Sequence, residues 1–240
     1  MRVSPQIVAS AMQLYFTGES LRNVQKFLRL QGVKVSHVAV YKWINKYVAL
    51  MKAYVDKITP NVSDTWRADE LYVKIKGDMK YLFALMDDET RFWIAQEVAE
   101  TEYKHDARRL FQLGQKATGK KPMTLITDGL PAYHDAYKKE FWTLRKDTST
   151  EHVNAIKLSG NMNNNRMERF NGEVRDREKV IRGLKKTDTS VLTGYQIFHN
   201  FVREREGLNG KTPAEACGIK VEGKNKWLTL IRNASRKTTK

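Results

Sequence analysis

The sequence predicts an α/β protein in which a mixed sheet flanked by helices follows a small all-α segment. Two changes of pattern support this prediction. Apolar residues recur at helical spacing over residues 1–56, whereas from Trp66 onward they alternate with a period of two. Beyond residue 105, helical and strand-like segments follow one another, which is typical of a mixed α/β sheet.

The N-terminal segment is expected to form three short helices. Ser4-Pro5, Ser20 and Ser36 are each placed to cap a helix, and Gly18 and Gly32 stand where the first two would end. Only a few residues around Gly32 separate the second helix from the third, as a helix-turn-helix requires.

The third of these helices would turn a polar side outward. Asn and Lys are residue types that contact base edges and phosphates in the major groove of DNA. The predicted DNA-contacting residues here are His37, Tyr41, Lys42, Asn45 and Lys46. The alternative is a trihelical module that serves dimerisation or only covers the domain that follows.

The sheet is expected to begin with three antiparallel strands. In ADELYVKIK, Asp69 lies on the same side as Leu71 and Val73, while Glu70 falls on the opposite side. The segments YLFALMD and RFWIAQEVA follow after short turns, and Asp87-Asp88-Glu89 is interpreted as a hairpin turn. A helix over 106–118, the strand MTLITDG and a helix from Pro131 complete the alternating part.

Four segments are predicted along the chain. They are a helix-turn-helix domain at 1–56, a linker at 57–65, a second domain at 66–218 and a basic tail at 219–240. The linker KITPNVSDT carries turn-forming residues without periodicity.

The charge balance indicates a polyanionic partner. The 240 residues include 43 Lys and Arg against 27 Asp and Glu, for a net charge of +16. Such a charge suits nucleic acid or an anionic membrane, and we favour nucleic acid. No apolar run approaches the roughly 18 residues of a membrane span, and the first residues do not resemble a signal peptide. The single cysteine, Cys217, excludes an intrachain disulfide and a cysteine-based zinc site, so a cytoplasmic location is expected.

Three carboxylates stand out from their surroundings. Asp69 lies on the apolar side of its strand, where an unpaired carboxylate is costly. Asp128 ends a strand, a position where ligands gather in α/β sheets. Glu168 begins the polar stripe of a predicted amphipathic helix within NMNNNRMERFNGEVRDREK. The alternatives are, in turn, a strand-end cap, an ordinary turn aspartate before Gly129 and a solvated helix face.

Taken together, these acids would suit a metal centre. Oxygen-only carboxylate ligands favour Mg²⁺ or Mn²⁺ over zinc. Two such ions a few ångströms apart would support in-line phosphoryl transfer.

Three stretches give the chain a specific resemblance. WRADELYVKIKG, LITDGLPAY and NNRMERFNGEVRDREKVIRG resemble the signature blocks of DDE transposases of prokaryotic insertion sequences, and KTPAEACGI resembles the end of their catalytic domain. The resemblance implies a ribonuclease-H-like, integrase-type core over 66–218 with Asp69, Asp128 and Glu168 as its metal-binding triad. Glu173 is the alternative third acid, but the pattern Asn164-Asn165-x-x-Glu168 favours Glu168.

Basic residues downstream of Glu168 are candidates for contacts to the DNA backbone. They are Arg175, Lys179 and Arg182, with Asn165 either orienting Glu168 or capping its helix. Ordinary ion pairing on a solvated helix is the alternative for each of these cations.

The predicted function is that of an insertion-sequence transposase. It would bind the element ends as a dimer or higher oligomer, cleave DNA with Mg²⁺ or Mn²⁺ and join the freed 3′-hydroxyl to target DNA. The alternatives are a ribonuclease-H-like nuclease or resolvase without strand transfer, and a DNA-binding relative without catalysis.

Overall fold

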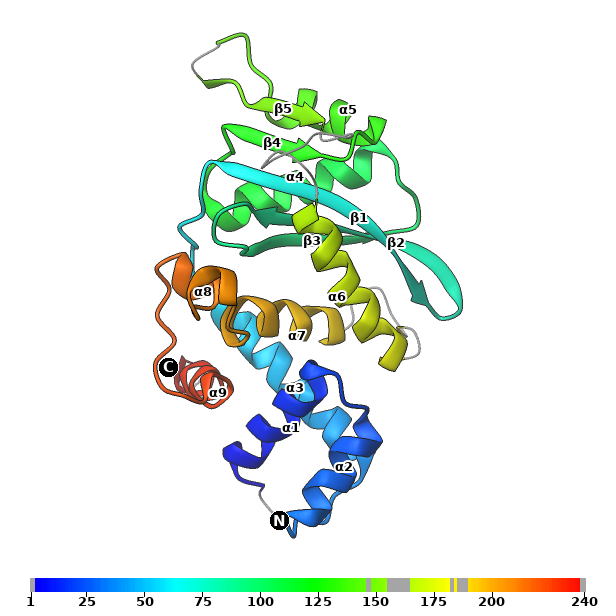
Figure 1. Ribbon diagram of the computed structural model, residues 1–240, viewed down its shortest axis with the longest axis vertical. Helices are drawn as coiled ribbons and strands as arrows, with labels where there is room; N and C mark the ends of the chain where they lie inside the picture. Colours follow the sequence, from blue (N-terminus) through cyan, green and yellow to red (C-terminus); the bar gives the residue numbers. More distant parts are fainter. Residues whose placement is uncertain (1–2, 146–147, 155–164, 182–183, 185–189, 238–240) are drawn as a thin grey trace.

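Three helices precede the sheet in the computed structural model, which describes residues 3–145, 148–154, 165–181, 184 and 190–237. They are α1 (Pro5–Thr17), α2 (Leu21–Leu30) and α3 (His37–Val55) (Figure 1). The predicted caps form, because the hydroxyls of Ser20 and Ser36 accept hydrogen bonds from the main-chain N–H groups of Asn23 and Ala39 at 3.2 and 3.1 Å.

The sheet has five strands in the described part of the chain, in the order β3-β2-β1-β4-β5. Its strands are β1 (Thr65–Ile75), β2 (Asp78–Asp87), β3 (Trp93–Ala99), β4 (Thr124–Thr127) and β5 (Glu151–Asn154). The first three are antiparallel, whereas β4 and β5 run parallel to β1. The mixed sheet and its antiparallel start confirm the prediction, while β5 was not predicted.

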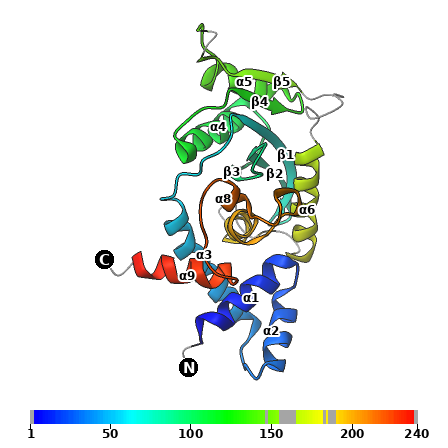
Figure 2. The ribbon, with the colours of Figure 1, turned by 60° about the vertical axis from the view of Figure 1, so that its left-hand side comes forward.

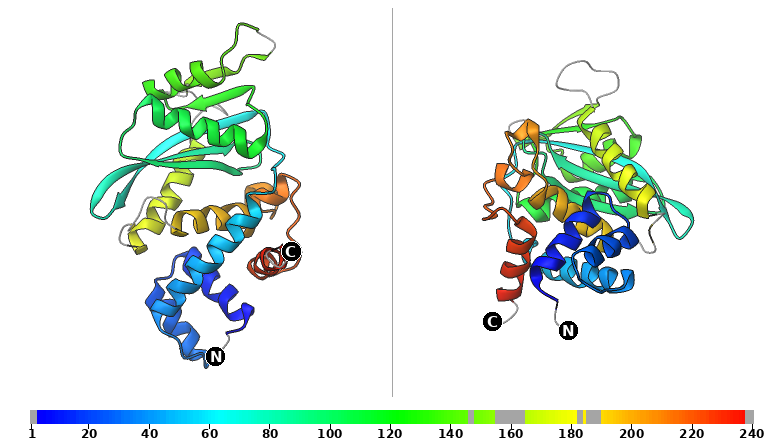
Figure 3. Two further views of the ribbon diagram at one scale, coloured as in Figure 1. Left: turned by 180° about the vertical axis from the view of Figure 1, so that it is seen from behind. Right: turned by 60° about the horizontal axis from the view of Figure 1, so that its bottom comes forward.

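Helices cover both faces of the sheet. On one face lie α4 (Lys104–Thr118) and α5 (Pro131–Glu140), and on the other lies α6 (Asn165–Ile181) (Figures 1 and 3). The ring of Tyr133 in α5 packs edge-on against Phe83 of β2, with ring centroids 6.0 Å apart. Phe170 of α6 packs in the same way against Trp93, at 4.7 Å.

A further helix, α7 (Ser190–Ile197), joins the sheet to the N-terminal helices. It continues into a π-helical turn at Phe198–Val202, where the side-chain amide of Asn200 bonds to the main chain of Trp93 at 2.8 and 2.9 Å. On its other side, Gly194 lies against Phe16 of α1 and Val48 of α3. The absence of a side chain at Gly194 lets the helices approach closely.

The C-terminal segment forms helices after a 3₁₀ turn at Glu206–Leu208. These are α8 (Pro213–Ala216) and α9 (Lys226–Lys237). The apolar residues of α9 lie inward, since Trp227, Leu230 and Ile231 are buried and Leu228 is half-buried. Helix α9 packs on α1 and α3. The N- and C-termini therefore both lie at the end of the molecule that the N-terminal helices form (Figure 2).

None of the described helices combines the length and the apolar character that a bilayer crossing needs.

Candidate metal centre

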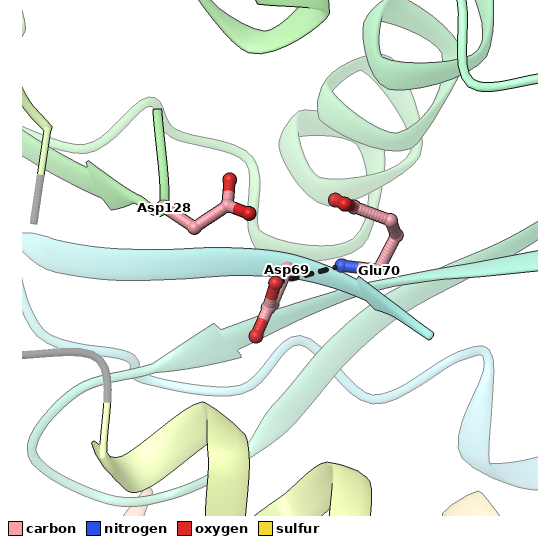
Figure 4. Close-up of side chains that lie close together, drawn as sticks. All are labelled: Asp69, Glu70 and Asp128. Carbon is pink, nitrogen blue, oxygen red and sulfur yellow. Dashed lines mark hydrogen bonds between the residues drawn. The ribbon is translucent and has the colours of Figure 1, made fainter. Parts of the chain in front are cut away.

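The parallel pairing of β1 with β4 brings two of the predicted acids together. Arg67 of β1 pairs with Ile126 of β4, so the same register places Asp69 level with Asp128, directly after the end of β4. A carboxylate oxygen of each lies within 4.8 Å of the other and of a carboxylate oxygen of Glu70 (Figure 4). We call Asp69, Glu70 and Asp128 the acidic cluster.

Asp69 is buried and held by two hydrogen bonds. Its Oδ1 accepts from the main-chain N–H of Glu70 at 3.0 Å, and its Oδ2 accepts from Nδ2 of Asn171 at 2.9 Å. Burial raises the pKa of Asp69 to about 7, helped by the charges of Glu70 and Asp128 and opposed by these hydrogen bonds. These contacts therefore orient a carboxylate that burial and its acidic neighbours keep hard to ionise.

Glu70 is the member of the cluster that sequence reasoning missed. Strict alternation puts it on the opposite side of β1 from Asp69, toward α5. Because β4 ends at Thr127, Asp128 lies at the strand edge, where side chains from both faces of β1 can reach it (Figure 4). The sequence did offer one indication of this role. Glu70 is an acid directly next to Asp69, on a strand that continues beyond the end of the neighbouring strand β4.

The surroundings of Glu70 are apolar and negative. Burial raises the pKa of Glu70 to about 7, with a further contribution from Asp128, while the hydroxyl of Tyr133 favours its charged form. Tyr133 is fully buried, and burial together with the carboxylates of Glu70 and Asp69 raises its pKa well above the usual value. The Oε2 atom of Glu70 has no hydrogen-bond partner among the described residues.

Glu168 lies in the first turn of α6 and is exposed, outside the group of described carboxylates that converge. It precedes Asn171 by three residues, so the two side chains are neighbours on one side of the helix. The structure therefore places Glu168 one helical turn from the residue that binds Asp69.

Both ends of α6 are attached to the sheet. Nη1 of Arg166 donates to the carboxylate and the carbonyl of Asp88, and a carboxylate oxygen of Glu178 accepts from the main-chain N–H of Lys74. With the Asn171–Asp69 bond, these contacts determine how α6 lies along β1. Asn171 itself is buried, although it lies one turn after the exposed Glu168.

Glu173, the alternative third acid, is occupied elsewhere. Its two oxygens accept from Arg205 at 2.8 and 2.9 Å, and Arg203 pairs with it at 2.8 Å. These arginines hold Glu173 away from the acidic cluster.

Asp87-Asp88-Glu89 lies at the predicted hairpin turn between β2 and β3, but Asp88 also makes long-range contacts. Asp87 does stabilise the turn, accepting from the main-chain N–H groups of Thr90 and Ser63 at 2.9 and 2.8 Å. The Asp88 carboxylate instead binds Arg67 and Arg166, linking β1 to the start of α6.

None of the predicted DNA-contacting residues that the structure describes belongs to the acidic cluster. On α3, Tyr41, Lys42 and Lys46 are exposed, and His37 and Asn45 are partly exposed. On α6, Asn165, Arg175 and Lys179 are exposed, and Lys179 pairs with Asp176 at 2.9 Å. Arg182 lies outside the described residues.

Comparisons with known proteins point to one family. A model of the IS240-type transposase family, described as "DDE domain", matches residues 63–205. Transposases of the insertion sequence-like element IS431mec and of IS257 in transposon Tn4003, both from Staphylococcus aureus, are 32% identical over 124 residues, which is 50% of this chain and 53% of theirs. The chain thus spans about half the length of the curated relatives it matches.

Solved integrase structures are similar at low sequence identity. The HTLV-2 integrase catalytic core domain in complex with magnesium is 16% identical with a TM-score of 0.49, over 67% of this chain and 98% of that one. The simian T-cell lymphotropic virus intasome in complex with PP2A regulatory subunit B56 gamma is 15% identical with a TM-score of 0.49, over 88% of this chain and 73% of that one. Since the DDE-domain model covers more than half of the chain, the protein belongs to the DDE transposase family of insertion sequences.

Proposed function

We propose that this transposase-family chain binds the ends of an insertion sequence and catalyses metal-dependent DNA cleavage and strand transfer. The observation that carries the proposal is the meeting of Asp69 and Asp128, which neighbouring strands bring within 4.8 Å beside Glu70. The family membership supplies the reaction class that such a cluster would serve.

The donor set fits a divalent cation that prefers oxygen. Its ligating atoms are carboxylate oxygens, which suit Mg²⁺ or Mn²⁺. Burial and mutual repulsion raise the pKa values of Asp69 and Glu70 to about 7, and a bound cation would offset both effects. When bound, one or two such ions would supply Lewis-acid stabilisation of the transferring phosphoryl group.

The protein's own contribution would be to hold the ligands in place. Asn171 donates to Oδ2 of Asp69 and so would orient this carboxylate toward a cation. We propose that Glu168, one turn before Asn171, completes the ligand set with Asp69 and Asp128. Glu70 would then add negative charge next to these ligands.

Recognition of DNA would involve α3 and the outward side of α6. In this proposal Asn45 faces base edges, while Tyr41, Lys42 and Lys46 contact phosphates. Arg175 and Lys179 would follow the DNA backbone outside the acidic cluster. Because transposition joins two ends, the active species would be at least a dimer on DNA, acting in the bacterial cytoplasm.

The test uses DNA that carries the native ends flanking the gene. With Mg²⁺, we expect the wild type to cut this DNA and to join it to a second duplex. Asp128→Asn and Glu168→Gln should abolish cutting without weakening DNA binding. Asp135→Asn, an exposed acid on α5, is the matched control and should cut normally.

Two outcomes would change the assignment. Substantial metal-dependent cutting by Glu168→Gln would remove Glu168 from the ligand set. Cutting by the wild type without any joined product would favour a nuclease over a transposase.

A further inference from the structure

Asp88, in the turn between β2 and β3, is the centre of a group of arginines. Arg67 donates to it through Nε and Arg166 through Nη1, and both bonds reach the same oxygen, Oδ1. The Arg67 side chain is fully buried, while those of Asp88 and Arg166 are 15% and 29% exposed. Two cations are thus fixed on one carboxylate at the start of α6.

Two more arginines lie close to this pair. Burial lowers the pKa of Arg91; Arg166 lowers it further, as do Arg67 and Arg169, while Asp88 raises it. The Arg91 guanidinium therefore lies close enough to the other three arginines to be repelled by them. We call Arg67, Arg91, Arg166 and Arg169 the arginine cluster.

Arg91 has a fixed backbone and a free side chain. Its φ is 60°, its N–H donates to the carbonyl of Asp87 at 3.1 Å, and its own carbonyl contacts Nε2 of His199 at 2.8 Å. Within the described part of the chain, its guanidinium makes no hydrogen bond or ion pair. A half-buried cation held among other cations favours an external anion.

The arginine cluster borders the acidic cluster. Arg67 precedes Asp69 by two residues on the same face of β1, about 7 Å away along the strand. Arg166 and Arg169 flank Glu168 in the first turns of α6.

We propose that Arg91, Arg166 and Arg169 bind a phosphodiester group of the DNA strand that lies across the acidic cluster. Asp88 and the buried Arg67 form the fixed base of this site. Guanidinium groups suit such a ligand because they donate to two phosphate oxygens at once. The inference rests on the proposed function, since it takes the same DNA strand as its ligand.

The experiment measures how salt weakens DNA binding by the full chain. Fluorescence anisotropy with a labelled duplex carrying the element end, in Ca²⁺, gives log K against log salt concentration. Each phosphate contact contributes about −0.9 to that slope. Arg91→Gln should make the slope less negative by about 0.9, whereas Arg91→Lys should preserve it.

The matched control is Arg109→Gln. Arg109 is an exposed arginine that pairs with Glu97 at 3.0 Å, remote from Asp88 in the sheet, and its loss should leave the slope unchanged. Should Arg91→Gln fail to fold, Arg169→Gln on the exposed side of α6 tests the same site. Wild-type slopes for both variants would overturn the proposal.

Two further arms separate the explanations. Inorganic phosphate at constant ionic strength should not displace the DNA, and displacement would overturn the assignment by showing a site for free phosphate. A wild type that shows the expected slope change but neither cuts nor joins DNA in Mg²⁺ would refute the transposase activity and leave the phosphate site standing.

Discussion

Replacing Asp69 with Asn should stabilise the metal-free protein at high pH and change little at low pH. The substitution keeps the size of the side chain and retains an oxygen that can accept a hydrogen bond, but it removes a buried charge. Burial, with Glu70 and Asp128 nearby, disfavours that charge in the folded state.

The size of the effect follows from the pKa. For Asp69 it rises from 3.8 to about 7 on folding, so the folded protein keeps a proton that the unfolded chain has released. Stability must then fall as the pH rises from 4 to 7. A difference of this size corresponds to about 4 kcal/mol, which is an upper value because the neighbouring carboxylates can relax.

The assay is urea unfolding followed by tryptophan fluorescence between pH 4 and pH 8, without metal. At an m-value of about 3 kcal/mol/M, the Asn variant should unfold at up to roughly 1 M more urea than the wild type at pH 8. At pH 4 the two midpoints should nearly coincide, since both residues are uncharged in the folded protein and the unfolded chain is only beginning to release the Asp69 proton. Glu70 is present in both proteins, so the difference reports on Asp69.

The same urea unfolding experiment is repeated with Mg²⁺ present. At one hundred times its Kd it should stabilise the wild type by about 2.7 kcal/mol and the variant much less. A difference between the two proteins that does not depend on pH, or a variant less stable than the wild type at pH 8, would refute this account of the cluster.

Three further predictions concern other parts of the molecule. Gly194→Ala places a methyl group against Phe16 and should lower the free energy of unfolding by about 1–3 kcal/mol, measured by urea unfolding. The control is Gly172→Ala, whose added methyl group meets no atom within 4 Å and should not destabilise the protein. Equal losses of stability in the two variants would contradict the close packing of α7. Asp88→Asn should cost about 1.5–3 kcal/mol of stability, because α6 loses the ion pair between Arg166 and Asp88. The same loss, close to Glu168, should reduce the initial DNA-cutting rate per folded molecule at least tenfold. An unchanged rate would show that this ion pair does not position the helix. Asn45→Ala should reduce discrimination between element-end and random DNA by about 1–3 kcal/mol without changing the salt dependence of binding. Lys46→Gln should instead reduce the slope of log K against log salt by about one and leave discrimination unchanged. Competition titrations at several salt concentrations measure both quantities, and the opposite assignment of the two effects would contradict the proposed roles.

Local patterns were sufficient for most elements of the fold. Alternation in β1 correctly placed Asp69, Leu71 and Val73 on a buried side, and serine caps correctly began α2 and α3. Such signals lie within a few residues of one another, so a single sequence displays them.

Contacts between distant segments were not predictable in the same way. The Asp88 carboxylate binds Arg67 and Arg166, which stand 21 and 78 residues away along the chain. Asn171 reaches Asp69 across 102 residues. Nothing in the local pattern around Asp88 or Asn171 distinguishes them from an ordinary turn acid and an ordinary polar helix residue.

The sequence by itself determined most of the strands and helices, though not β5, and it singled out Asp69, Asp128 and Glu168, because periodicity, turn residues and short motifs are local properties. Only the tertiary structure decided that Glu70 joins Asp69 and Asp128, since that depends on the register of β1 with β4 and on β4 ending at Thr127. It also decided which charges pair, because Glu173 and Asp88 find their arginines only once α6 lies on the sheet.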